Sequence, residues 1–154
     1  MTWQLRRATV ADLDDIMRLE EEMFPSDSWS RDLMLEELAA PHSYYLVALG
    51  EQGGLDGYAG LRAPDGSPEA DIQTLAVVPA VRRQGLGRRL VDALVAEARA
   101  RGAEEVFLEV RVDNPGAQQL YTSLGFENIA VREHYYQPDD VAAQIMRLDL
   151  VVAS

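Results

Sequence analysis

Short apolar runs alternate along the chain with longer stretches in which apolar residues recur every three or four positions. The short runs predict strands, whereas the longer stretches have the period of a helix. The predicted strands cover residues 3–8, 43–50, 55–63, 70–78, 104–110, 130–136 and 142–150. The predicted helices cover residues 10–23, 31–38, 87–101 and 114–125. The order βααβββαβαββ inserts helices between strands, which predicts a layered α/β fold with helices on both faces of the sheet.

Local signals support several of these boundaries. Thr9 is a candidate N-cap for the first helix, with Asp12 three residues further on, and Ser30 is a candidate cap for the second. The segment "EQGG" between two apolar runs predicts a hairpin. Asn114-Pro115 favours the start of the last helix.

The turn before the long helix combines glycines with arginines in the spacing Arg82-x-x-Gly85-x-Gly87. The first N–H groups of a helix lack intrahelical partners and carry partial positive charge. Glycines there let a ligand approach the backbone, and Arg82, Arg83 and Arg88 add full charges. The turn therefore predicts a phosphate or pyrophosphate site, the alternative being an ordinary turn with solvated arginines. It lacks both the Lys-Ser/Thr ending of an NTPase loop and the full G-x-G-x-x-G fingerprint.

A carboxylate interrupts the apolar strand at residues 104–110. Alternation places Glu109 on the face opposite Leu108 and Val110, where a charge costs free energy unless it is solvated, paired or used. Tyr121 lies on the following helix, and the strand end and helix could bring both side chains to one cleft. Taken singly, Glu109 could instead be satisfied by Arg111 or solvent, and Tyr121 could be a core aromatic.

Aromatic residues at both ends of the chain are candidates for a substrate cleft. Trp29 and Phe24 lie in an early loop, and Tyr135 and Tyr136 precede a late turn. The alternatives are a loop anchor for Trp29 and core packing for one of the tyrosines. The acidic run at residues 20–22 could attract a basic peptide, although such runs usually mark a solvated helix face. His134 is a weaker candidate for a base than Glu109.

Composition limits the remaining possibilities. The chain has 154 residues, which suits a single domain over residues 1–154. Its net charge of −12 disfavours nucleic acid as the main partner and suits a cationic one, or simply aids solubility. Without cysteine there is no thiol nucleophile, and two histidines exclude a histidine-rich metal centre. We expect a cytoplasmic protein without membrane association, since no apolar run suffices for a span or a signal peptide.

The segment "TLAVVPAVRRQGLGRRL" resembles the acetyl-coenzyme-A-binding motif of the GNAT acetyltransferase superfamily. The resemblance implies the fold of that superfamily, a mixed, mostly antiparallel sheet flanked by helices on both faces. The resemblance implies that the backbone of Leu75, Ala76 and Val77 pairs with the pantetheine arm. It also implies a pyrophosphate site made by the residues of the turn, namely Arg83, Gln84, Gly85, Leu86, Gly87 and Arg88.

Further along, "LEVRVDN", "LYTSLGF" and "REHYY" resemble the ribosomal-protein-alanine N-acetyltransferase (RimI-type) branch of that superfamily. Together the matching segments extend from about Ile72 to Leu148, with a weaker likeness at "FPSDSW". The resemblance implies Glu109 as proton acceptor, Tyr121 as proton donor and Asn114 as a coenzyme contact. It also implies direct transfer from acetyl-CoA to a peptide N-terminus, namely the N-terminal alanine of a small-subunit ribosomal protein. This peptide would bind between segments that carry Trp29, Tyr135 and Tyr136.

The acid–base chemistry of amines favours an N-terminal acceptor. An amine attacks a thioester only when it is neutral, and an α-amine has a pKa of about 8, against about 10.4 for lysine. At neutral pH lysine therefore needs about 3 kcal/mol more to become nucleophilic. A small amine, an antibiotic or a lysine side chain stays open as acceptor, as does a non-catalytic acetyl-CoA-binding regulator. We expect a monomer or a weak dimer.

Overall fold

The chain folds around one mixed β-sheet. In a computed structural model, which describes residues 3–151, the sheet has seven strands in the order β1-β2-β3-β4-β5-β7-β6. Its strands are β1 (Gln4–Arg7), β2 (Ser43–Leu49), β3 (Leu55–Arg62), β4 (Glu69–Val77), β5 (Glu105–Arg111), β6 (Glu127–Tyr136) and β7 (Val141–Asp149). The helices are α1 (Leu13–Met23), α2 (Arg31–Ala39), α3 (Leu86–Ala100) and α4 (Pro115–Ser123), with short 3-10 turns at Val10–Asp12 and Pro79–Val81. Apart from these turns, the element order is the predicted one.

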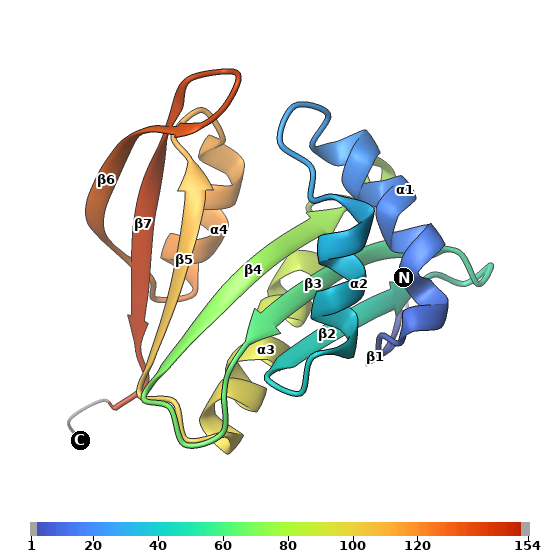
Figure 1. The fold of residues 1–154 in the computed structure, drawn as a ribbon, viewed down its shortest axis with the longest axis horizontal. Helices are drawn as coiled ribbons and strands as arrows, with labels where there is room; N and C mark the ends of the chain where they lie inside the picture. Colours follow the sequence, from blue (N-terminus) through green and yellow to red (C-terminus); the bar gives the residue numbers. More distant parts are fainter. Residues whose placement is uncertain (1–2, 152–154) are drawn as a thin grey trace.

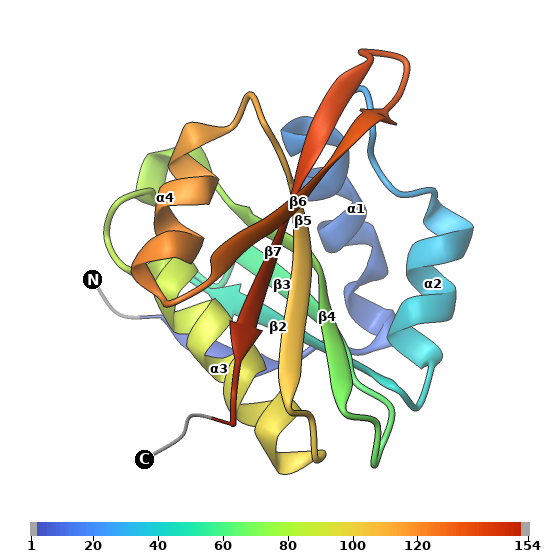
Figure 2. The same cartoon turned by 90° about the vertical axis from the view of Figure 1, so that its left-hand side faces the viewer.

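Helices cover the sheet on both faces, as expected from their insertion between strands. Figures 1 and 2 show α1 and α2 on one side of the sheet and α3 and α4 on the other. In β2, Tyr45 and Val47 join the core beneath α1 and α2, whereas Leu46 and Ala48 join the core beneath α3. Because both of its faces are buried, β2 is apolar from Tyr44 to Leu49 instead of alternating with polar residues.

The predicted caps form. The Thr9 side chain accepts from the Ala11 N–H at 3.3 Å, and the Asp12 carboxylate accepts from the Thr9 N–H at 2.8 Å. Ser30 caps α2 by accepting from the Leu33 N–H at 3.1 Å. Among residues 3–151 no helix is long and apolar enough to cross a membrane.

The parallel pair β4 and β5 separates within the sheet. Their register runs from Glu69 opposite Glu105 to Asp71 opposite Phe107, after which both strands continue apart (Figure 1). Just there, the β3–β4 register skips Gln73, because Gly60 faces Thr74 while Leu61 faces Ile72. Such a bulge bends its strand and increases the local twist. The bend leaves residues 72–77 of β4 without a strand neighbour on the β5 side.

Candidate active site

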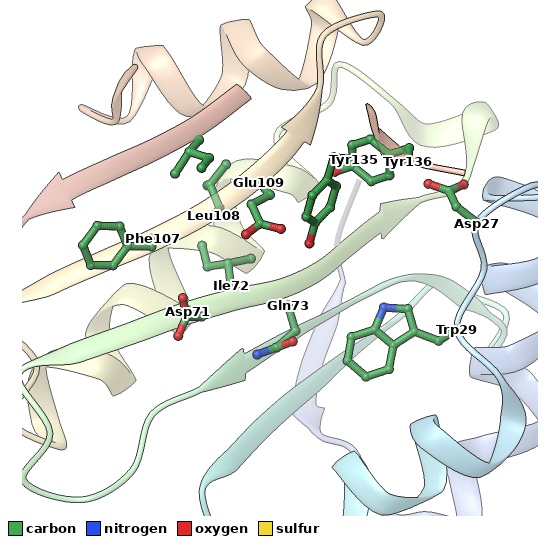
Figure 3. A pocket seen from close by; sticks show the side chains of 11 residues that line it. Asp27, Trp29, Asp71, Ile72, Gln73, Phe107, Leu108, Glu109, Tyr135 and Tyr136 are labelled. Carbon is green, nitrogen blue, oxygen red and sulfur yellow. The ribbon is translucent and has the colours of Figure 1, made fainter. Parts of the chain in front are cut away.

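The separated strands enclose two adjoining hollows, a larger cleft of about 430 Å³ and a smaller pocket of about 140 Å³. Glu109 and Gln73, from β5 and β4, border both of them. Figure 3 shows Glu109 facing the space between the two strands, with Tyr135 and Tyr136 on one side and Trp29 on the other. The larger cleft is lined by Asp27, Trp29, Asp71, Ile72, Gln73, Phe107, Leu108, Glu109, Tyr135, Tyr136 and Ile145.

Glu109 lies on the face that alternation predicted. Leu108 and Val110 are buried in the core beneath α3, so the Glu109 side chain projects from the opposite face of β5. Its carboxylate lies 3.8 Å from the guanidinium of Arg132 on β6. The alternative pairing with Arg111 is wrong, because that guanidinium contacts other carboxylates. An accessible carboxylate on the cleft wall can accept a proton from a bound amine or from a water.

Tyr121 reaches the same region from α4. Its side chain is 7% exposed, packs edge-to-face on Phe126 and borders the smaller pocket together with Glu109 and Asn114. The structure therefore brings Glu109 and Tyr121 to one pocket from two different elements. Burial raises the pKa of the Tyr121 hydroxyl above its ordinary value. A tyrosine is already protonated at neutral pH, so the phenol can donate a hydrogen bond.

The predicted turn leaves the start of α3 open. Gly85 is the N-cap residue with φ +92° and makes no side-chain cap, and a Cβ placed there would meet nothing within 4 Å. The first N–H groups of α3 therefore face open space beside the exposed residues Arg83 and Gln84. Leu86 buries its side chain in the core, so only its backbone is available at the turn. This geometry suits an anionic group.

Other residues of the turn already have partners. A Cβ on Gly87 would lie 3.1 Å from Leu120 of α4, so this glycine permits close packing of the two helices and does not open space for a ligand. Arg88 donates to the Ser123 hydroxyl at 3.1 Å and ties α3 to α4. Arg82 donates to the Val77 carbonyl at 3.2 Å, at the end of the free edge of β4.

That free edge also carries the residues predicted to pair with pantetheine. Leu75 borders the smaller pocket, Ala76 is buried and Val77 is half-buried. Asn114 caps α4 by accepting from the Ala117 N–H at 3.2 Å, which leaves its amide N–H groups for a ligand. Unpaired strand edges offer backbone donors and acceptors to an extended ligand.

The acidic run contains a buried residue that was expected to be solvated. Glu21 and Glu22 are exposed, but Glu20 is 1% exposed because it lies on the face of α1 that packs on the sheet. One of its carboxylate oxygens accepts from the Tyr58 hydroxyl, and the other accepts from the Trp29 N–H at 2.9 Å. Burial raises the pKa of Glu20. The prediction of a solvated or peptide-attracting run is therefore wrong for this residue.

The predicted aromatic residues line the hollows. Trp29 is half-buried, anchored through its backbone and borders both hollows, while Phe24 borders the smaller pocket. Tyr135 and Tyr136 pack edge-to-face with ring centroids 4.9 Å apart. Burial, with a hydrogen bond to Glu109, raises the pKa of Tyr135 to about 12. His134 lines neither hollow and pairs with Asp140.

Several polar groups of the cleft were not predicted. Asp27, Asp71 and Gln73 line the larger cleft, and burial together with the nearby Glu109 charge raises the pKa of Asp71. The polar positions 71 and 73 alternate with the buried Ala70 and Ile72, a pattern that could have identified this face of β4. The carboxylates of Asp71 and Glu109, on the neighbouring strands β4 and β5, favour a cationic group on the ligand.

Comparisons with known proteins identify the family of this chain. The model of the acetyltransferase (GNAT) family matches residues 13–126. The N-alpha-acetyltransferase RimI of Mycobacterium tuberculosis is 38% identical over 144 residues, covering 92% of this chain and 89% of that protein. The [ribosomal protein bS18]-alanine N-acetyltransferase of Escherichia coli is 44% identical over 72 residues, which cover 47% of this chain and 49% of that enzyme.

Solved structures share the whole architecture. The crystal structure of the ribosomal-protein-S18-alanine N-acetyltransferase from Escherichia coli superposes with a TM-score of 0.84 at 28% identity, covering 99% of this chain and 97% of that one. Arabidopsis thaliana NAA60 in complex with acetyl-CoA superposes with a TM-score of 0.87 at 15% identity, covering 97% and 99% of the two chains. The second likeness concerns the fold alone.

The raised pKa of Glu20 predicts a pH-dependent contribution to stability. In the folded state Glu20 holds its proton more tightly than in the unfolded chain, so the folded state binds more protons between the two pKa values. The difference in free energy of unfolding between the wild type and Glu20→Gln should therefore fall as the pH rises above 4.5, the ordinary pKa of a glutamate. Urea unfolding between about pH 4 and pH 8 measures this difference. Glu21→Gln is the exposed control on the same helix, and equal pH profiles for both variants would contradict the prediction.

Proposed function

Because the chain belongs to the GNAT family of acetyltransferases, we propose that it transfers the acetyl group of acetyl-CoA to the N-terminal α-amino group of a protein. This membership confirms the family resemblance, and the family uses acetyl-CoA as its co-substrate. The observation that carries the proposal is the meeting of Glu109 and Tyr121 at one pocket where β4 and β5 separate. The acetyl thioester supplies an activated acyl group, and the chain supplies position, a base and a hydrogen-bond donor.

We propose the N-terminal alanine of a small-subunit ribosomal protein as the acceptor. Two of the named relatives are N-alpha- and ribosomal-protein-alanine acetyltransferases. The larger cleft, with carboxylates from Asp71 and Glu109, suits the positively charged end of a peptide. An α-amine loses its proton to a single carboxylate more easily than lysine does. Such an acceptor implies action in the cytoplasm.

The two catalytic side chains have complementary roles. Glu109 accepts a proton from the attacking amine, directly or through a water, from its position on the wall of both hollows. Tyr121, a phenol that is protonated at neutral pH, donates its proton to the departing thiolate. Among Leu75 to Val77, the backbone N–H groups that point away from β3 polarise the thioester carbonyl.

The pyrophosphate of the coenzyme binds at the turn before α3. The uncapped N–H groups of α3 bind the pyrophosphate, with Arg83, Gln84 and the Gly85–Leu86 backbone around them. Gly87 contributes by letting α4 approach, and Arg88 fixes the same two helices. Asn114 reaches the coenzyme through its remaining amide N–H groups.

Replacing Glu109 with Gln or Tyr121 with Phe should lower kcat by about 100-fold or more while acetyl-CoA affinity changes little. Each change removes one proton-transfer group and keeps the shape of the side chain. Steady-state kinetics and calorimetric titration with acetyl-CoA measure the two quantities. Glu133→Gln and Tyr44→Phe, on residues that line neither hollow, are the matched controls. Wild-type turnover in both active-site variants would refute the role assignment.

Replacing Gly85 with Ala should weaken acetyl-CoA binding, because φ +92° strains an L residue by about 1–2 kcal/mol and reshapes the turn. Gly66→Ala is the matched control, since Gly66 has φ +78° and equally open surroundings but lies in the β3–β4 loop. Both variants should lose similar stability, whereas the dissociation constant of acetyl-CoA should rise only for Gly85→Ala. Equal affinity in the two variants would place the coenzyme elsewhere.

A panel of acceptors tests the proposed substrate class. The purified chain and acetyl-CoA are offered peptides that begin with Ala, Ser or Met, an N-terminally blocked peptide with one lysine, polyamines and aminoglycosides. We expect kcat/KM for the alanine peptide to exceed that for the blocked peptide by about 100-fold, in line with the 3 kcal/mol difference in amine acidity. Preference for a small amine or lysine would overturn the acceptor. Acetyl-CoA binding without transfer to any acceptor would favour a regulatory protein.

A further inference from the structure

Arg111, the last residue of β5, contacts three separate segments of the chain. Its Nε and one Nη donate to the two carboxylate oxygens of Asp113 at 3.0 and 3.1 Å. Another donation, at 3.1 Å, goes to Asp139 in the turn between β6 and β7, and Asp27 in the α1–α2 loop lies 3.5 Å away. The guanidinium also stacks on the Tyr136 ring, 5.2 Å from its centroid. One cation thus joins the strand end to an early and a late segment.

Two of these segments are the walls of the larger cleft. The α1–α2 loop provides Asp27 and Trp29, and the end of β6 provides Tyr135 and Tyr136. Figure 3 shows Asp27 next to Tyr136, with Trp29 and Tyr135 facing the same space. The loop is fixed at its far end by the buried Glu20, which accepts from the Trp29 N–H. Arg111 joins this anchored loop to the β6–β7 hairpin.

We infer that Arg111 is a positioning residue that sets the distance between the two walls of the larger cleft and thereby the affinity for the peptide acceptor. This inference rests on the proposed function, because it takes the larger cleft as the peptide site.

The charges around Arg111 explain why the walls depend on it. Asp27, Asp113 and Asp139 surround a single guanidinium, so its removal leaves three carboxylates that repel one another. The side chains of Arg111 and Asp27 are only 20% and 18% exposed, which limits screening by water. Lysine cannot make the same contacts, because its ammonium neither donates two parallel hydrogen bonds to one carboxylate nor stacks flat on a ring.

The kinetic test compares Arg111→Gln and Arg111→Lys with the wall variants Asp27→Asn and Asp139→Asn. We expect Arg111→Gln to raise KM for the alanine peptide about tenfold, with kcat and the KM for acetyl-CoA within about twofold of wild type. Arg111→Lys should reverse less than half of this increase in the peptide KM. In the Arg111→Gln background each wall variant should add less than about twofold, because the partner of its carboxylate is already gone. The inference would be overturned if the effects of the variants on the peptide KM were fully additive or if Arg111→Gln left that KM unchanged. It would also be overturned if Arg111→Gln lowered kcat as strongly as it raised the peptide KM.

Hydrogen exchange tests the same inference without activity. Exchange of backbone amides at residues 24–30 and 136–141 should accelerate together in Arg111→Gln. The milder variant Asp139→Asn should accelerate both segments by less, and it keeps the test possible if Arg111→Gln does not fold. Arg18→Gln, which removes an exposed ion pair with Asp15 on α1, is the matched control and should leave both segments unchanged. Faster exchange in one segment alone, or across the whole sheet, would overturn the inference. A wild-type chain that fails to acetylate peptides would refute the proposed function while the exchange result still decides whether Arg111 joins the walls.

Discussion

The separation of β4 from β5 is the constraint on which the site depends. Neighbouring strands normally satisfy each other's backbone groups, and here the pairing stops at Asp71 and Phe107 while both strands continue. The bulge at Gln73 keeps β4 paired with β3 and bends it away from β5. The rest of the sheet therefore keeps this edge of β4 unpaired. As a result, the sheet is open between the face covered by α1 and α2 and the face covered by α3 and α4. Tyr121 can border the same pocket as Glu109 because the sheet is open at this point.

Two electrostatic environments occur on different elements of the fold. The start of α3 presents uncapped N–H groups near exposed arginines, which suits an anion. Asp71 and Glu109, on the neighbouring strands β4 and β5, make the larger cleft acidic, which suits a cation. The two environments match the charges of the phosphate-bearing donor and the amine acceptor that we propose. The net charge of −12 agrees with the acidic cleft but does not reveal this division.

The walls of the larger cleft come from the α1–α2 loop and the β6–β7 hairpin, and titratable side chains attach them to the sheet. Glu20 holds the α1–α2 loop from inside the core through Trp29, and its hydrogen bond with Tyr58 links it to β3. Arg111 joins the two walls of the larger cleft through Asp27 and Asp139. Buried or half-buried charges of this kind are costly to leave unpaired, so their partners stay in one arrangement. Fixed walls would favour precise placement of the acceptor that we propose for this cleft.

The amino-acid sequence by itself determined the features that depend on neighbours along the chain. Periodicity identified every strand and helix, the caps at Thr9 and Ser30, and the face of β5 on which Glu109 lies. Boundaries were less certain, and β6 begins at Glu127 although its apolar pattern suggested Ala130. The turn before α3 could also be recognised, since helix starts and glycine spacing are local properties.

Only the tertiary structure decided which residues from distant segments meet. Glu20 looked like one member of a solvated acidic run, and it is buried because α1 turns that face onto the sheet. Gly87 looked like space for a ligand, and it accommodates Leu120 of another helix. Arg111 looked like a partner for Glu109 two residues away, yet carboxylates from an early loop and a late turn hold it instead. Local patterns fix which side of an element a residue occupies, but the strand pairing and helix packing fix what lies opposite that side.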